Sequence, residues 1–202
     1  GLLKLAAKLR VEGGEFLSAM EFFSDVGLGI ALENIPGLVF PLQSRASFYL
    51  LVEAGSGSMQ VPLDSILTEV LEWGLSEDIV TDGALAMSET QRAAFWRLRE
   101  EQPEGQRRLG AQLKHDLSVP PGRLGEFLDR ANDVCSELLK GVIINSFGHL
   151  GDGNVHYNLS PPLGQQDFSG LDIEFALKLG KLATVMGGSF AAEHGIGRAK
   201  TA

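Results

Sequence analysis

Several residue types that would define a class of protein are scarce in this 202-residue sequence. A single cysteine, Cys135, excludes a disulfide framework within the chain and suits a reducing compartment. Basic residues are also few: 17 Lys and Arg face 26 Asp and Glu, a net charge of −9 that disfavours nucleic acid and anionic membranes as partners. No apolar run approaches the roughly 18 residues of a membrane-spanning helix. These absences predict a folded, cytoplasmic protein without a transmembrane segment, and peripheral membrane association stays open.

Glycine is abundant and histidine is rare. The sequence has 25 glycines and only 4 histidines, whereas glycine averages roughly 7% of residues in globular proteins. The chain begins within the helical pattern of residues 1–11 and stops just after 194–200, where a loop enters a new helix. Both ends predict a piece of a longer polypeptide, with a trimmed chain as the alternative.

Hydrophobic periodicity predicts alternating helices and strands. Helices are expected at 1–11, 18–33, 62–73, 88–101, 124–139 and 170–186. Strands are expected at 47–53, 78–86, 111–119, 141–150 and 154–160. Ser88, with Gln91 three residues on, is typical of a capping box. We therefore expect an α+β fold, ferredoxin-like in style, with an antiparallel or mixed sheet and helices on one face.

The late strand pair carries two of the four histidines. Asp152-Gly153 between two strand-like runs is a strong hairpin signal, and a two-residue turn there places His149 opposite His156. Directly opposed Cβ atoms lie about 4.5–5.5 Å apart, a span that one metal ion bridges through two imidazoles. Nearby glycines would let the backbone approach a bound group. The alternatives are two ordinary polar side chains on a half-exposed sheet, or a longer turn with another register.

A second histidine loop lies near the end of the chain, where Glu193-His194 is followed by Gly195 and Gly197. A carboxylate and an imidazole side by side can serve one site, the carboxylate as a metal ligand and the imidazole as a base. Glu193 would complete a His-His-Glu site with an open coordination position.

Other polar residues divide into site candidates and structural ones. Arg99 borders the apolar face of its helix and is able to hold a carboxylate by a bidentate fork. Lys114 faces away from the apolar side of its strand, whereas His115 faces the core and is expected to be a packed, hydrogen-bonded histidine. Cys135 lies in the buried stripe of its helix and is expected to be structural.

Four segments carry a resemblance to a known family. They are Phe95-Trp96-Arg97-Leu98-Arg99-Glu100-Glu101, Lys114-His115-Asp116 with Ser118-Val119-Pro120, Gly148-His149-Leu150-Gly151-Asp152-Gly153-Asn154-Val155-His156, and Glu193-His194-Gly195-Ile196-Gly197. In order and spacing they resemble the C-terminal, substrate-capping domain of FAD-linked 2-hydroxy acid dehydrogenases, a family that includes enzymes for D-2-hydroxyglutarate, D-lactate and glycolate.

The resemblance implies a site and a reaction. It implies His149, His156 and Glu193 as ligands of a divalent metal, zinc by preference, Arg99, Lys114 and Asn158 as substrate contacts, His194 as the base, and Gly195 and Gly197 near the flavin. The implied enzyme oxidises a D-2-hydroxy acid to the 2-keto acid by hydride transfer to FAD.

The same resemblance implies that residues 1–202 are one domain, incomplete at both ends and lacking the domain that binds FAD, so that alone they should be inactive. The implied partners are that FAD domain and an electron acceptor, and further copies of the chain if the protein is a homo-oligomer. Two alternatives remain: a metal-dependent hydrolase, or a noncatalytic ferredoxin-like binding module.

Overall fold

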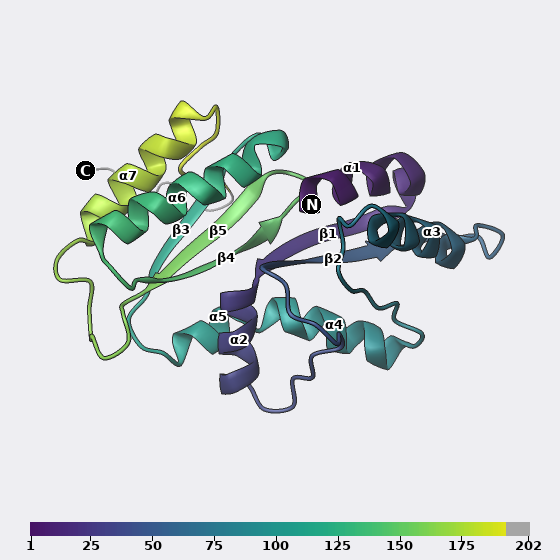
Figure 1. Ribbon diagram of the computed structural model, residues 1–202, viewed down its shortest axis with the longest axis horizontal. Helices are drawn as coiled ribbons and strands as arrows, with labels where there is room; N and C mark the ends of the chain where they lie inside the picture. Colours follow the sequence, from purple (N-terminus) through teal and green to yellow (C-terminus); the bar gives the residue numbers. More distant parts are fainter. Residues whose placement is uncertain (193–202) are drawn as a thin grey trace.

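A computed structural model describes residues 1–192, which form an α+β arrangement around one sheet (Figure 1). The helices of this part of the chain are α1 (Leu2–Gly13), α2 (Asp25–Asn34), α3 (Leu63–Ser76), α4 (Glu89–Glu100), α5 (Gln102–Arg107), α6 (Leu124–Leu138) and α7 (Asp172–Val185). The strands are β1 (Leu17–Ser24), β2 (Phe48–Ala54), β3 (Leu113–Ser118), β4 (Ile143–His149) and β5 (Asn154–Ser160).

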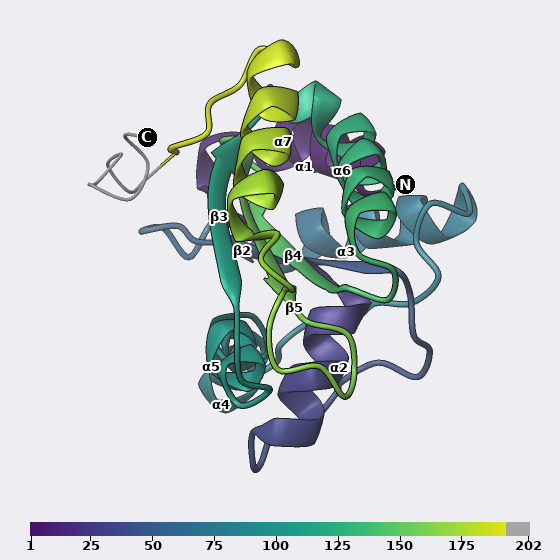
Figure 2. The same cartoon turned by 90° about the vertical axis from the view of Figure 1, so that its left-hand side faces the viewer.

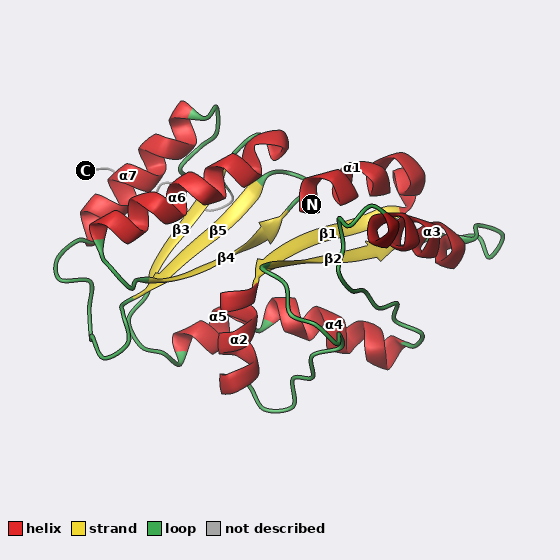
Figure 3. Ribbon diagram, viewed as in Figure 1, coloured by secondary structure: helices red, strands yellow, loops and turns green. Residues whose placement is uncertain are grey.

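The five strands form one antiparallel sheet in the order β2-β1-β4-β5-β3. Helices α1, α6 and α7 lie over one face, with α3 packed against α1, and α2, α4 and α5 lie over the other face (Figures 2 and 3). The predicted α+β class with an antiparallel sheet is confirmed. The expectation of helices on one face differs from the structure, which has a second helical layer below the sheet.

The two faces of the sheet bury different side chains. Tyr157, Leu159 and the apolar stripes of α6 and α7 form the larger core on the α6–α7 face. A smaller core on the α2–α4 face contains Phe23, Tyr49 and Phe147. Beside this smaller core the strands carry polar residues, so the α2–α4 face is where a site can be built.

One predicted helix, 18–33, proves to be two elements. Residues Leu17–Ser24 form strand β1, and α2 begins only after Ser24, whose Oγ accepts a hydrogen bond from the backbone N–H of Gly27 at 3.3 Å. Strand β1 lies inside the sheet, between β2 and β4, and Phe22 and Phe23 are buried on opposite faces. A strand buried on both sides reads as a continuous apolar run, which is why the helical interpretation was wrong here.

The strand predicted at 78–86 is also wrong, because this segment is irregular. Its position is fixed by Asp82, whose Oδ2 accepts the backbone N–H groups of Gln43 at 2.6 Å and Ser44 at 3.1 Å. These donors hold the pKa of the Asp82 carboxyl below its usual range. Loop-to-loop contacts of this kind leave no periodic signal in the sequence.

The remaining predicted elements are confirmed to within a few residues, including the start of α4. Ser88 Oγ accepts the backbone N–H of Gln91 at 3.3 Å, and Gln91 Oε1 accepts the backbone N–H of Met87 at 2.6 Å. Ser88 thus caps the helix as predicted, whereas the Gln91 side chain accepts from the residue before the cap and not from the N–H of Ser88, as it would in a capping box. None of the helices in residues 1–192 is long and apolar enough to span a bilayer.

Candidate functional site

The two hairpin histidines lie on the α2–α4 face of the sheet, close to each other. His149 ends β4 and His156 is in the middle of β5, and their ring centroids are 6.0 Å apart in an edge-to-face arrangement. The predicted proximity of the two imidazoles is therefore confirmed.

The predicted register of the hairpin is wrong by two residues. Phe147, not His149, lies opposite His156, and a four-residue connection at 150–153 replaces the two-residue turn. The connection is fixed by neighbours: Leu150 N–H donates to Met20 O at 2.9 Å, and Val119 N–H donates to Gly153 O at 2.9 Å. A shift by two keeps every side chain on its face, so the histidines stay on one side of the sheet.

The glycines of the hairpin serve backbone packing. A Cβ at Gly148 would lie 2.1 Å from the carbonyl oxygen of Asn154, and one at Gly153, which has φ of 69°, would lie 1.9 Å from that of Val119. Only glycine allows these approaches. Glycine is therefore needed at Gly148 and Gly153 because neighbouring backbone segments pack closely against the hairpin.

A carboxylate lies beside Nδ1 of each histidine. Glu21 Oε1 contacts His149 Nδ1, and Asp116 Oδ1 lies 3.8 Å from His156 Nδ1. Glu21 is the register partner of His149, and Asp116 is that of His156. A histidine that binds a metal through Nε2 commonly has such a carboxylate at Nδ1, so both imidazoles fit the role of metal ligands.

The described residues do not bring together three His, Cys, Asp or Glu side chains in a group that could hold a metal ion. The predicted third ligand, Glu193, lies outside the described residues, as do His194, Gly195 and Gly197. The last described residues lie beside β3, near His156. Ser118 and Ser189 exchange two backbone hydrogen bonds of 2.9 Å, and Ala192 N–H donates to Asp116 O at 3.3 Å.

Arg99 differs from the other arginines of α4 and α5. Its side chain is only 10% exposed; its Nε donates to Glu21 Oε2 at 2.9 Å, and its guanidinium lies 4.5 Å from the centroid of the Phe147 ring. Glu21 thus contacts Arg99 with one oxygen and His149 with the other. Arg99 therefore lies close to His149, and its role as a substrate contact stays a prediction.

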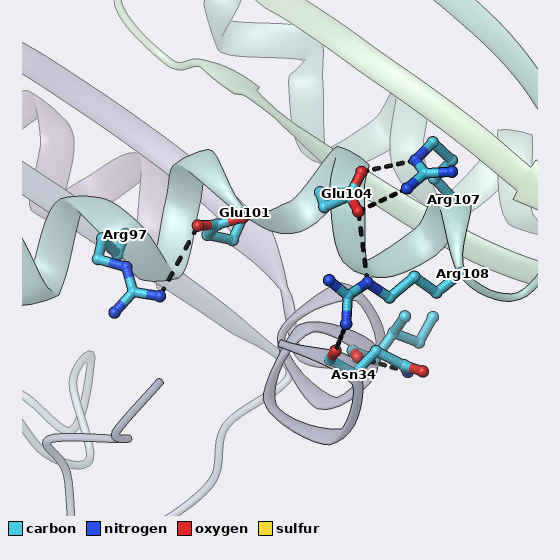
Figure 4. Close-up of polar contacts among 7 residues, drawn as sticks. Asn34, Arg97, Glu101, Glu104, Arg107 and Arg108 are labelled. Atoms are coloured by element: carbon cyan, nitrogen blue, oxygen red, sulfur yellow. Dashed lines mark hydrogen bonds and ion pairs between the residues drawn. The ribbon is translucent and has the colours of Figure 1, made fainter. Parts of the chain in front are cut away.

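The neighbouring arginines take part in exposed ion pairs along the helices (Figure 4). Glu104 accepts from Arg107 at 2.6 Å and from Arg108 at 3.3 Å, and Arg108 also contacts the backbone oxygen of Asn34 in α2. Arg97 lies 3.8 Å from Glu101. These arginines lie on a solvated helix surface, and the hydrogen bonds from Arg107 and Arg108 hold the pKa of Glu104 down at about 2.

Lys114 and Asn158 are neighbours on the same face, because they are register partners of β3 and β5. Lys114 is exposed and Asn158 is buried. Asn158 is also the register partner of Asn145 in β4, which is fully buried. The structure thus brings Arg99, His149, His156, Asn158 and Lys114 to one face of the sheet.

The two residues predicted to be structural are confirmed as such. His115 is buried, with Nδ1 2.9 Å from the backbone oxygen of Tyr157, and Cys135 is fully buried against Tyr157 in the larger core. Burial raises the pKa of the Cys135 thiol to about 12. The thiol is therefore protonated at neutral pH and is no nucleophile.

A sizeable cavity lies elsewhere in the part of the chain that the structure describes. A cavity of about 650 Å³ borders β2, α1 and α3 and passes beneath the irregular segment 78–88. Its walls are mainly apolar, and the described site residues are not among its lining. The candidate site is therefore separate from this cavity: it lies on the polar part of the α2–α4 face, where Arg99 and Asn158 are buried and Lys114 is exposed.

Glu21 is the site residue that the sequence analysis missed. Glu21 lies inside the predicted helix 18–33, and an acidic residue on the exposed side of a helix is ordinary. A single acid between apolar neighbours, in Ala19-Met20-Glu21-Phe22-Phe23, is the signal that could have found it, because a buried carboxylate requires a partner.

This combination of an antiparallel sheet, a histidine hairpin and a buried arginine agrees with the sequence match of the chain to a family. The chain belongs to the FAD linked oxidases, C-terminal domain, which it matches over residues 2–202.

Curated relatives point in the same direction. The chain is 33% identical over 198 residues to "D-2-hydroxyglutarate dehydrogenase, mitochondrial" of Arabidopsis thaliana, covering 96% of this chain and 34% of the relative. It is 32% identical over 189 residues to the protein of the same name from Danio rerio, covering 93% of this chain and 34% of the relative. It is 30% identical over 188 residues to "D-2-hydroxyglutarate dehydrogenase" of Stutzerimonas stutzeri, covering 91% of this chain and 39% of the relative. The chain thus spans about a third of the length of these relatives.

Proposed function

We propose that this chain is the substrate-binding and metal-binding part of an FAD-dependent enzyme that oxidises a D-2-hydroxy acid to the 2-keto acid. The observation that carries the proposal is the cluster on the α2–α4 face, in which Glu21 contacts both Arg99 and His149. Arg99, whose guanidinium suits a substrate carboxylate, and His149, whose imidazole suits a metal ion, both contact the carboxylate of Glu21. A 2-hydroxy acid presents the matching groups, a carboxylate and a hydroxyl, on adjacent carbons.

His149 and His156, with Glu193, would hold a divalent metal, for which zinc is our first choice. Two imidazoles with a carboxylate ligand suit zinc, which keeps an open position in catalytic sites. When bound, the metal supplies a Lewis acid at the 2-hydroxyl, and the flavin supplies the hydride acceptor.

The residues of the chain have separate tasks in this proposal. Arg99 binds the substrate carboxylate through its Nη groups while Nε stays on Glu21. Lys114 adds a second positive charge beside the amide of Asn158. His194 takes the hydroxyl proton. Gly195 and Gly197 let the loop approach the flavin closely.

The substrate that we favour is D-2-hydroxyglutarate. Two cations, Arg99 and Lys114, suit its two carboxylates, and the relatives named above carry this substrate in their names. D-lactate, with one carboxylate, is the second candidate, since a monocarboxylate is able to use both cations.

The test uses the full-length polypeptide that contains this chain. We expect flavin absorbance that is bleached by D-2-hydroxyglutarate faster than by D-lactate, and slower bleaching after treatment with a chelator or in His149→Ala. A colourless protein contradicts the flavoenzyme proposal and favours a hydrolase or a binding module. Bleaching unchanged by chelator and by His149→Ala contradicts the metal site.

The partners proposed for the chain are the FAD domain, an electron acceptor and, in an oligomer, a second copy of the chain. A cytoplasmic location stays a prediction, and the Arabidopsis thaliana and Danio rerio relatives are named as mitochondrial proteins. Fractionation of cells that express the full-length polypeptide distinguishes the two locations.

A further inference from the structure

Glu21 occupies an unusual position for a carboxylate. It lies in the central region of the sheet on β1, paired in register with Leu51 of β2 on one side and with His149 of β4 on the other. Its side chain is only 6% exposed. A buried carboxylate at such a position needs strong partners, and the structure gives it one for each oxygen: Arg99 at Oε2 and His149 at Oε1.

The chemistry of these partners fixes their protons. An ionised carboxylate only accepts hydrogen bonds, so both partners must donate. The Nε of Arg99 always carries a hydrogen. The Nδ1 of His149 must then carry one too, which in a neutral ring leaves the lone pair on Nε2.

We propose that Glu21 is a positioning residue that holds His149 in the tautomer with its lone pair on Nε2 and, with its other oxygen, holds the Arg99 guanidinium beside it. This inference rests on the proposed function, in which His149 is a metal ligand and Arg99 binds the substrate carboxylate. Glu21 touches neither metal nor substrate. It sets the spacing between the two groups that do, so that metal affinity and substrate affinity depend on one buried side chain.

The stacking of Arg99 supports this role. The guanidinium lies over the Phe147 ring, and Phe147 is in β4, two residues before His149 and opposite His156. The Arg99 guanidinium is therefore held from two sides, by the Phe147 ring and, at its Nε, by Glu21. A guanidinium fixed in this way is pre-organised for a carboxylate ligand.

Glu21→Gln is the informative variant, because it keeps the size of the side chain. A glutamine amide has one accepting oxygen and one donating nitrogen. It cannot accept from Arg99 and His149 with separate oxygens, so one of the two contacts must change. If the nitrogen faces His149, the ring must accept at Nδ1 and carry its proton on Nε2, which blocks a metal ion there.

The matched control is Glu53→Gln. Glu53 lies on β2 on the same face of the sheet, and its carboxylate accepts from Trp96 Nε1 at 2.7 Å and from Arg92 at 2.8 Å, both in α4. This variant also removes a carboxylate from beside an arginine of α4, but not the one beside His149.

The experiment measures Zn²⁺ affinity of the full-length polypeptide by competition with a chromophoric chelator. We expect Glu21→Gln to weaken Zn²⁺ binding by about 10–100-fold and to raise KM for D-2-hydroxyglutarate more than it lowers kcat. Glu53→Gln is expected to leave both quantities unchanged. A folded Glu21→Gln protein with the Zn²⁺ affinity and KM of the original overturns the inference.

A second measurement needs neither metal nor a variant of Glu21. In the metal-free protein, the ¹⁵N chemical shifts of the His149 ring, assigned by comparison with His149→Gln, should show the proton on Nδ1. A proton on Nε2 overturns the inference even where Glu21→Gln fails to fold. If the original protein binds no Zn²⁺ yet shows the Nδ1 proton, the metal part of the proposed function fails and the positioning role of Glu21 stands.

Discussion

Two carboxylate–arginine clusters, one on α5 and one between β1 and α4, show how burial changes what the same chemical groups do. On α5, Glu104 pairs with Arg107 and Arg108, whose side chains are 67% and 44% exposed, and all three belong to adjacent turns of one chain segment (Figure 4). Beneath α4, Glu21 pairs with Arg99 at 6% and 10% exposure, and 78 residues of sequence separate the two.

The exposed cluster forms from local sequence and is screened by water, so its contribution to stability is small. The buried cluster exists only where β1, β4 and α4 meet, and both of its charges are almost completely removed from water in the folded protein. The position of a charge in the fold, and not the identity of its partner, therefore decides whether the charge can serve a binding site.

The largest effect is expected from breaking the buried cluster. Glu21→Ala leaves the Arg99 guanidinium without the carboxylate that Nε contacts, and the free energy of unfolding should fall by about 3–5 kcal/mol, as for other buried pairs that lose one partner. Urea unfolding of the 202-residue chain, followed by circular dichroism, measures this loss. Glu104→Ala serves as the exposed counterpart and should barely move the transition. Equal losses in the two variants would contradict the comparison.

A smaller effect is expected when the buried cation keeps its charge but loses its shape. In Arg99→Lys the ammonium still reaches Glu21, but it lacks the planar group that stacks on Phe147 and the paired N–H donors for a carboxylate. We expect the free energy of unfolding to fall by about 1 kcal/mol. KM for D-2-hydroxyglutarate in the full-length polypeptide should rise about tenfold, which corresponds to about 1.4 kcal/mol.

The counterpart is Arg107→Lys, which should change neither quantity. An unchanged KM in Arg99→Lys would mean that the charge alone suffices and that the fixed guanidinium plane has no role in binding.

The same contrast explains what could be predicted from the sequence. The cap at Ser88 and the buried position of Cys135 depend on residues a few positions apart, and spacing and periodicity predicted both of them. The two histidines of the hairpin were also predicted to lie together, because the hairpin is a local structure. Their register was not, because contacts with Met20 and Val119, far away in sequence, set the length of the turn.

Glu21 shows why the rest was out of reach. Its role requires that β1 be a strand, that this strand lie beside β4, and that α4 cross the same face. The apolar residues around Glu21 fit a helical period as well as a strand buried on both faces. Because β1 was not predicted as a strand, its pairing with β4 and its contact with α4 could not be predicted either. Long-range pairing decided the site, and a single sequence contains little information about it.

The smallest effect concerns the exposed cluster and its dependence on pH. The pKa of Glu104 is lowered from 4.5 to about 2, chiefly because Arg107 donates hydrogen bonds to the carboxylate. A lowered pKa in the folded state means that the cluster adds stability above pH 4.5 and that this contribution is lost as the pH falls toward 2.

Glu104→Gln should therefore be slightly less stable than the original chain at pH 7, and the difference should shrink to nothing between pH 4.5 and 2. Urea unfolding of both chains across this range checks the prediction. The difference should also shrink in 1 M NaCl, where the screening length is about 3 Å, whereas the loss in Glu21→Ala should persist in the same salt. If the difference in stability between Glu104→Gln and the original chain persisted in both acid and salt, the exposed cluster would behave like the buried one, and the contrast between them would be wrong.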